Sequence, residues 1–277
     1  MPITSLSQAH LTLLDTCDRK YQYIFFDALS APATYDRQLT TQWGSQFHLL
    51  MQQRAMNLPI EVIASANKEM TASVEALAAA APQLFEQVSL THSEIDCDAE
   101  SFFKQSEHRR TLAFNGYLLT AIYDLLILGP SKGQIFDWKT HQKPPQKDWL
   151  QQDWQTRLYL YILCETTELE PEQISMTYWF VRLGAANQQP SFYQFGYSWP
   201  QHQQTQKDLG ALTAKLTRMI AQLEFPKVPA GSELCDTCAF NVRCDRATPN
   251  STFLYESVQA LREASGILPE SVEEIPL

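Results

Sequence analysis

The chain has 277 residues, of which 44% are hydrophobic and 11% aromatic, as expected for a folded globular protein and not for a disordered one. Its formal net charge of −10 argues against broad, non-specific attraction to nucleic acid or to an anionic membrane. The charge does not exclude a narrow basic groove, because a bound metal ion can supply positive charge locally.

Neither a targeting pattern nor a membrane-spanning pattern is found in the sequence. The first residues contain no basic region followed by an apolar stretch, so no signal peptide is predicted. The most apolar segment, 117–128, is interrupted by Asp124 and is too short to span a bilayer, so it is predicted to be a buried strand. We therefore expect a cytoplasmic protein that does not bind membranes, in which clustered cysteines favour metal or cluster ligation over disulfides.

Apolar residues at helical spacing dominate the first third of the chain, and they predict helices over 4–27, 39–57 and 62–84. The pattern then changes to short β-branched or aromatic segments separated by glycine and proline, which predicts an antiparallel meander over 94–103, 111–128 and 134–139. Further helices are predicted over 149–165 and 201–224, and strands over 175–183 and 192–198. This order predicts one α/β domain with a mixed sheet flanked by helices.

The sequence contains a late group of three cysteines and an isolated early one. Cys235, Cys238 and Cys244 have the spacing C-x₂-C-x₅-C, and a tight turn in a C-x₂-C pair can direct both sulfurs toward one ion or cluster. Three such ligands need a fourth, and Cys17 is available if the fold brings the two ends together. The spacing alone leaves a zinc ion and an iron–sulfur cluster as nearly equal alternatives.

Two carboxylates lie near the ends of neighbouring predicted strands. An unpaired Asp124 inside an apolar strand would be costly, and Asp137 and Lys139 share one face of the next strand because side chains alternate. If the two strands form a hairpin around 129–133, Asp124 can lie across from Asp137. Adjacent carboxylates repel each other and are expected to bind a hard cation such as Mg²⁺ or Mn²⁺, beside which Lys139 could orient or deprotonate a water molecule. The alternative is a solvated ion pair at the strand ends.

Three further residues have a spacing that suits a place near this site. His48 follows Gly44 by one helical turn and could reach a metal through an imidazole nitrogen, although an interfacial histidine would fit the same position. Gln155 and Tyr159 are four residues apart and share a helix face, where they could also be packing residues. The basic stretch 104–110 could line a DNA path, but a solvated loop is the simpler interpretation.

Together these motifs resemble a known arrangement. In order, they are Gly44-x-x-x-His48, Asp124, Asp137-x-Lys139, Gln155-x-x-x-Tyr159 and the late cysteine group. The set resembles the RecB-like branch of the PD-(D/E)XK nuclease superfamily. Within that branch it is similar to the iron–sulfur members, namely the AddB nuclease domain, the Dna-two-type helicase–nucleases and the CRISPR-associated adaptation exonucleases. In those proteins one cysteine precedes the nuclease motifs and three follow them.

The resemblance implies a restriction-endonuclease-like core and a role for each of these residues. The implied catalytic residues are Asp124, Asp137 and Lys139. The implied metal ligands are His48, Asp124, Asp137 and the backbone carbonyl of Trp138. Gln155 and Tyr159 would contact DNA or support the site. A mainly structural [4Fe–4S] cluster, or less readily Zn²⁺, would be held by Cys17, Cys235, Cys238 and Cys244.

The resemblance also implies an organisation and an activity. Residues 1–277 would form a single nuclease domain, in which 1–30 and 226–248 bind the cluster and 249–277 form a C-terminal helix and tail. We expect a deoxyribonuclease that depends on Mg²⁺ or Mn²⁺ and hydrolyses single-stranded DNA or DNA ends, as an exonuclease. The chain has no G-x₄-G-K-[ST] motif and hence no motor of its own, so a helicase or another protein could be its partner.

Two other functions compete with this interpretation. The first keeps the fold but makes the chain a non-catalytic DNA-binding or scaffold subunit of a DNA-repair or CRISPR-adaptation complex. The presence of His48, Asp124, Asp137 and Lys139 argues against it, because a decayed site would be expected to lose at least one of them. The second is a zinc-stabilised protein with an unrelated metal-dependent hydrolase site.

Overall fold

The computed structural model describes residues 5–30, 35–60, 67–85, 102–140, 144–182 and 189–246. The chain divides into two compact units, which are described separately. The larger unit consists of Met1–Thr12 and Ala33–Gln222, and the smaller unit of Leu13–Pro32 and Leu223–Leu277. The assignment of 1–277 to one nuclease domain remains a prediction, and the C-terminal helix and tail predicted for 249–277 lie outside the described residues.

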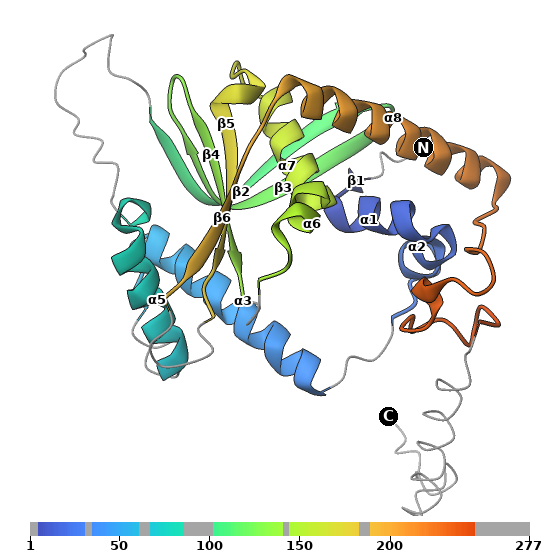
Figure 1. The fold of residues 1–277 in the computed structure, drawn as a ribbon, viewed down its shortest axis with the longest axis horizontal. Helices are drawn as coiled ribbons and strands as arrows, with labels where there is room; N and C mark the ends of the chain where they lie inside the picture. Colours follow the sequence, from blue (N-terminus) through green and yellow to red (C-terminus); the bar gives the residue numbers. More distant parts are fainter. Residues whose placement is uncertain are drawn as a thin grey trace, which may run out of the picture. The chain divides into compact units, whose positions relative to one another are not determined.

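The described part of the larger unit contains a six-stranded sheet with the order β1-β3-β4-β5-β6, in which β2 also pairs with β3 (Figure 1). The strands are β1 (Ser5–Leu6), β2 (Phe103–Phe114), β3 (Tyr117–Leu128), β4 (Gly133–Lys139), β5 (Ile174–Phe180) and β6 (Ser191–Gly196). β2 and β3 pair in antiparallel orientation, as do β3 and β4, which the predicted meander requires, whereas β1 pairs with β3 and β4 with β5 in parallel. The predicted mixed sheet is therefore confirmed.

The boundaries of the first strands differ from the prediction. The segment 111–128 is not one strand, because Asn115 and Gly116 form a turn between β2 and β3 with φ angles of 48° and 83°. Asn-Gly is a favoured pair for such two-residue hairpin turns, because both residues tolerate positive φ. The basic stretch 104–110, interpreted as a loop, belongs to β2, and most of the predicted strand 94–103 lies outside the described residues.

The helices are α1 (Gln8–Thr16), α2 (Asp18–Phe25), α3 (Tyr35–Ala55), α5 (Lys68–Ala80), α6 (Lys147–Gln152), α7 (Trp154–Glu165) and α8 (Trp199–Gln222), with short 3₁₀ turns at Pro82–Leu84, Pro171–Gln173 and Glu233–Cys235. Two predicted helices are each divided in two. Cys17 adopts an extended conformation between α1 and α2, and Asp153 does so between α6 and α7. The Asp153 side chain accepts a hydrogen bond from the Gln155 backbone N–H at 2.7 Å, which caps the start of α7.

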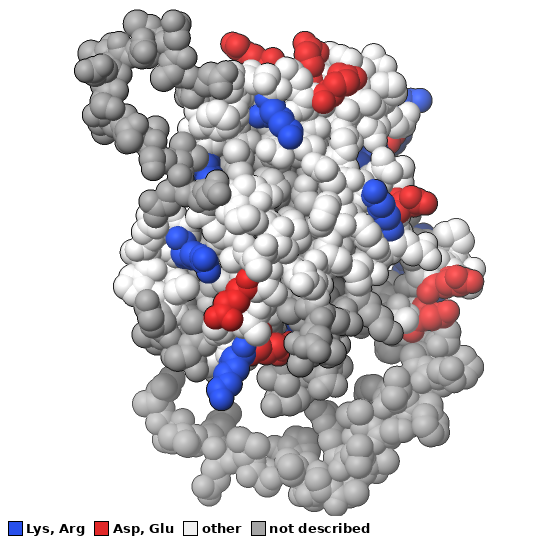
Figure 2. All heavy atoms as spheres, turned by 60° about the vertical axis from the view of Figure 1, so that its left-hand side comes forward, with Lys and Arg blue, Asp and Glu red and all other residues white. Residues whose placement is uncertain are grey.

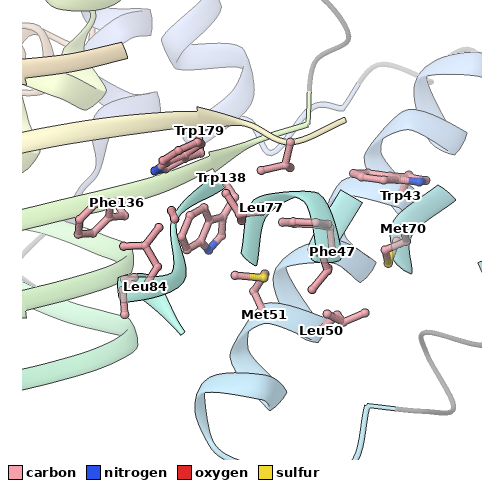
Figure 3. Close-up of a cluster of buried hydrophobic side chains, with 14 residues drawn as sticks. Trp43, Phe47, Leu50, Met51, Met70, Leu77, Leu84, Phe136, Trp138 and Trp179 are labelled. Atoms are coloured by element: carbon pink, nitrogen blue, oxygen red, sulfur yellow. The ribbon is translucent and has the colours of Figure 1, made fainter. Parts of the chain in front are cut away.

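The two faces of the sheet are covered by different helices. On one face, side chains of α3 and α5 pack with the sheet in a buried apolar cluster, which includes Trp43, Phe47, Leu50, Met51, Met70, Leu77, Leu84, Phe136, Trp138 and Trp179 (Figure 3). Adjacent residues of a strand point to opposite faces. Trp179 of β5 accordingly joins this cluster, whereas the hydroxyl of its neighbour Tyr178 hydrogen-bonds Thr156 of α7 at 2.7 Å. α7 therefore covers the second face.

In its described residues, 13–30 and 223–246, the smaller unit has little regular structure besides α2 and the end of α1. Tyr21 of α2 stacks on Phe225 with ring centroids 6.4 Å apart, and Tyr23 packs against Phe240 at 5.4 Å. The backbone N–H of Arg19 donates to the carbonyl of Pro226 at 3.1 Å. These contacts hold the early and late segments of this unit together. In the described parts of both units, no helix is long and apolar enough to cross a membrane.

Candidate functional site

Asp124 and Asp137 lie side by side on β3 and β4. The pairing of these strands ends with Leu125 and Phe136, and each aspartate is the next residue beyond that pair. Both side chains are buried, with 7% and 4% of their surface exposed. The Trp138 backbone N–H donates to Asp124 Oδ2 at 2.7 Å, which fixes the carboxylate against the neighbouring strand. The hairpin expected around 129–133 thus places the two carboxylates together.

A fork in the sheet creates room for these carboxylates. β2 pairs with β3 along its whole length, so β1 and β4 must share the other edge of β3. β1 pairs there with Leu118 and Leu119, and β4 pairs from Leu125 onward. Along residues 120–124 of this edge, the described structure has no partner strand. The hydroxyl of Tyr159 on α7 instead hydrogen-bonds the backbone of Ile122, so α7 occupies the fork.

Lys139 and Asp137 are joined directly and through a glutamine. Lys139 Nζ lies 2.8 Å from Asp137 Oδ1, and it donates to Gln155 Oε1 at 2.6 Å. The amide nitrogen of Gln155 donates to Asp137 Oδ2 at 2.5 Å. Lys139 Nζ also lies 4.8 Å from the centre of the Tyr178 ring, a distance typical of a cation–π contact. The ammonium group is therefore held beside the carboxylate from several directions.

His48 reaches the carboxylates from α3. Its Nδ1 lies 3.3 Å from Asp124 Oδ1, and its Nε2 lies 3.2 Å from the Trp138 carbonyl oxygen. One helical turn earlier, a Cβ on Gly44 would lie 2.9 Å from the Thr140 hydroxyl oxygen, closer than real Cβ contacts allow. Glycine at this position lets α3 approach the end of β4 and brings the histidine within reach of the site.

Glu107 of β2 completes the group, and the sequence reasoning missed it. Ligand atoms of His48, Glu107 and Asp124 all lie within 4.8 Å of one another. Glu107 has a φ of 50°, unusual for a residue with a side chain, and it interrupts the register between the pairs Ser106–Leu125 and His108–Tyr123. Recognising the Asn-Gly turn would have found it, because that register places Glu107 opposite Asp124.

Burial and mutual repulsion govern the charges of these groups. Burial and the charge of Asp137 together raise the pKa of Asp124 from an ordinary value of 3.8 to about 6, although His48 and the Trp138 backbone N–H act in the opposite sense. Burial lowers the pKa of His48, but its contacts with Asp124 and Glu107 outweigh that effect and raise the pKa to about 10. Without a cation, a proton on His48 therefore offsets part of the carboxylate charge.

The sequence profile of the PD-(D/E)XK nuclease superfamily matches residues 5–245. The chain belongs to this superfamily. Among solved structures, the chain is similar to a candidate exonuclease from Eubacterium rectale, with 13% identity over 88% of this chain and 89% of that one and a TM-score of 0.49. It is also similar to the protein SSO0001, with 12% identity over 90% of both chains and a TM-score of 0.38. No curated protein matches the sequence.

PD-(D/E)XK nucleases use divalent metal ions, and the donor set of this nuclease fits one. Hard divalent cations prefer carboxylate and carbonyl oxygens, and Mn²⁺ also accepts an imidazole nitrogen. His48, Glu107 and Asp124 form a group that could hold such an ion. Asp137 Oδ1 is buried and accepts no hydrogen bond, so it keeps lone pairs available beside its contact with Lys139. The carbonyl oxygen of Trp138 lies 3.2 Å from Nε2 of His48, a member of the same group.

The structure places Gln155 and Tyr159 of this nuclease at different depths. Gln155 lies at the site itself, between Lys139 and Asp137. Tyr159 is only 4% exposed, and its ring packs edge-on against Tyr123 with centroids 5.3 Å apart. Burial raises the pKa of the Tyr159 hydroxyl, and the two nearby carboxylates add to this. The buried position of Tyr159 suits a residue that supports the fork in the sheet better than one that contacts a substrate.

The four cysteines lie in the smaller unit, and they line one small cavity of about 30 Å³ there. The Cys238 backbone N–H donates to the Cys235 carbonyl at 3.2 Å, as in the tight turn expected of a C-x₂-C pair. Burial raises the pKa of the Cys235 thiol, and the nearby Cys238, Cys17 and Cys244 raise it further. Four convergent thiols fit a soft metal centre, either Zn²⁺ or an iron–sulfur cluster.

Proposed function

We propose that the chain is a deoxyribonuclease that depends on Mg²⁺ or Mn²⁺ and hydrolyses phosphodiester bonds. The observation that carries this proposal is the convergence of Asp124, Asp137, Lys139 and His48 at one fork of the sheet, in a member of a nuclease superfamily. The proposed metal ligands are His48, Asp124, Asp137 and the Trp138 carbonyl. The geometry adds Glu107 to them. DNA is the expected substrate of this superfamily.

The proposed mechanism assigns each residue a part of the hydrolysis. A bound divalent cation supplies Lewis-acid stabilisation of charge on the scissile phosphate and lowers the pKa of water. Lys139 holds and orients the attacking water, because its ammonium group lies beside Asp137 at the edge of the carboxylate pair. Gln155 restricts both partners by donating to Asp137 and accepting from Lys139. Burial of the carboxylates strengthens these electrostatic interactions, since the local dielectric constant is lower than that of water.

We also propose that the enzyme acts on single strands or from free ends, as an exonuclease. The resemblance to the RecB-like iron–sulfur branch supports this, and so does the net charge of −10, which disfavours tight duplex binding. The same charge supports a helicase or other protein partner that delivers the DNA. Labelled linear and circular DNA, each single- and double-stranded, should be compared with Mn²⁺, Mg²⁺ or EDTA. We expect metal-dependent cleavage of linear single strands only. Equal cleavage of circles would contradict the exonuclease assignment.

A second part of the proposal concerns the smaller unit. We propose that Cys17, Cys235, Cys238 and Cys244 hold a mainly structural [4Fe–4S] cluster and that 1–30 and 226–248 form its binding part. The shared cavity of the four thiols supports a common metal centre. Protein purified without oxygen should be brown and contain iron and sulfide. Colourless protein with one zinc ion would overturn the cluster assignment and leave the nuclease assignment intact.

A further inference from the structure

A hollow runs from the candidate metal site along the larger unit. It has a volume of about 640 Å³, and its lining includes Glu107 and Trp138 of the metal site. A second hollow of about 580 Å³ adjoins it, because Gln52 and Glu107 line both, and this one includes His48. The two hollows therefore adjoin at these residues, and their linings include three of the proposed metal ligands, Glu107, Trp138 and His48. We call the two hollows together the groove.

Aromatic rings line the groove beyond the metal site. Phe102 leaves 49% of its surface exposed, and Phe85 carries the Arg54 guanidinium over its ring at 4.4 Å. The ring of the next residue, Phe103, packs instead against His108, with ring centroids 5.0 Å apart, and His108 stacks on Tyr123 outside the groove lining. The Phe102 ring lies against Gly129, where an added Cβ would be only 3.3 Å from it. Exposed rings grouped around one hollow are unfavourable in water and indicate a binding surface. A suitable occupant has flat apolar faces to stack on them.

The charged side chains that line the groove indicate which kind of molecule can bind there. In the described lining, the basic side chains are Arg54 and Lys104, and the other polar groups are largely amides and hydroxyls such as Gln52 and Ser106. Figure 2 shows the side on which α5 lies, where charged side chains are scattered singly among uncharged atoms. A duplex exposes its phosphates and hides its base faces, so it needs many cations for affinity. A single strand exposes base faces that can stack on aromatic side chains.

We propose that the groove binds a single DNA strand, one base of which stacks on Phe102 and whose backbone continues past Glu107 into the metal site. Arg54 and Lys104 contact phosphates of the same strand. Two proposed metal ligands, Glu107 and His48, belong to the lining, which favours the substrate strand over a protein segment as the occupant. This inference rests on the proposed nuclease function, because it assigns the path of that enzyme's substrate.

Two substrates distinguish binding in the groove from hydrolysis at the metal site. Bis(p-nitrophenyl) phosphate reports on the metal site alone, whereas a short single-stranded oligonucleotide also needs the groove. Phe102→Leu keeps an apolar side chain but removes the ring, and Phe103→Leu, whose ring packs against His108, is the neighbouring control. With Mn²⁺, the kcat/KM of Phe102→Leu for the oligonucleotide should fall by about 10- to 100-fold, the loss expected for one stacked base. Its activity on the small phosphodiester should stay within about twofold of wild type.

Matched variants guard against a loss of folding. Phe102→Trp keeps an aromatic face and should retain oligonucleotide cleavage, and Trp199→Leu removes an exposed ring that is not part of the groove lining. Equal oligonucleotide cleavage by Phe102→Leu and wild type would overturn the proposal. So would an equal loss in Trp199→Leu. If wild type cleaves neither substrate, the nuclease function fails, and binding still tests the groove.

Binding is measured in EDTA with an oligonucleotide that contains 2-aminopurine, whose fluorescence is quenched by stacking. Wild type should quench it, and Phe102→Leu should not. With two cations on phosphates, the logarithm of the binding constant should fall with the logarithm of salt concentration with a slope of about −1.4, taking about −0.7 per contact. A slope steeper than about −4, or equal quenching by both proteins, would show that phosphate contacts dominate and would overturn the stacking proposal.

Discussion

In the carboxylate site, the protein itself partners most of the polar groups. Asp124 accepts from a backbone N–H, Asp137 accepts from Gln155, and Lys139 is held by both Asp137 and Gln155. The four cysteines are different, because they are only half-buried and three of them lie in a loop with one short 3₁₀ turn. The sheet and α7 hold the groups of the first site through their own contacts, whereas the proposed metal centre would add to the few aromatic and backbone contacts that join the segments of the second.

The largest expected effect is on catalysis at the carboxylate site. Lys139→Ala should lower the hydrolysis rate by about 10²- to 10⁴-fold, because it removes the group that orients the attacking water. The melting temperature is measured as well, because Asp137 and Gln155 lose their contacts with Lys139 in this variant, and the rates are compared at a temperature at which both proteins are folded. Lys207→Ala on the exposed surface of α8 is the matched control and should keep full activity. A Lys139→Ala enzyme with normal turnover would contradict the mechanism.

Losing a cysteine should have the opposite consequence. In Cys235→Ala, the visible absorption and iron content should disappear, and limited proteolysis should cut the loop 226–246 faster, because the segments of the smaller unit lose their common ligand. Cys164→Ala, which removes a buried thiol of the larger unit, should keep both iron and colour. If Cys235→Ala stayed coloured and protease-resistant, that cysteine would not be a ligand.

A smaller loss is expected when the link between the catalytic groups is removed. Gln155→Ala should reduce kcat by about 10- to 100-fold, the range seen when partners of metal ligands are removed. The KM for the oligonucleotide should change less, because Gln155 positions Lys139 and Asp137 and does not line the groove. Gln204→Ala on the exposed surface of α8 serves as the control. An unchanged kcat would show that the two catalytic groups need no such support.

The smallest predicted effect is a dependence of metal stabilisation on pH. Both Asp124 and His48 have folded-state pKa values above their ordinary ones, about 6 and about 10, so the metal-free fold binds more protons than the unfolded chain. Its stability from these groups falls as pH rises through those values. A cation must displace the same protons, so the increase in melting temperature with Mn²⁺ should grow from about pH 5 to about pH 8. Glu107→Gln should reduce that increase, and a pH-independent increase would contradict the assignment.

Elements that depend on local periodicity could be predicted well from the sequence, whereas the pairing of strands and the breaks within helices could be predicted less well. β4 and α8 were predicted within one to two residues of their ends, because alternation and helical periodicity are local signals. Periodicity could not show the breaks at Cys17 and Asp153, where a single extended residue separates two helices of similar pattern. Glu107 was missed for another reason. Its role depends on the strand register that the Asn115-Gly116 turn sets, and the sequence prediction placed this turn inside a single strand.

The most direct test of the central claim is the release of labelled nucleotides from linear single-stranded DNA by wild type and Asp137→Asn with Mn²⁺. Asparagine keeps the shape of the side chain but removes the charge that faces Lys139 and the metal ligands. The account predicts metal-dependent release by wild type, and none above background by a folded, equally stable and still coloured Asp137→Asn protein. Equal release by both proteins would contradict it.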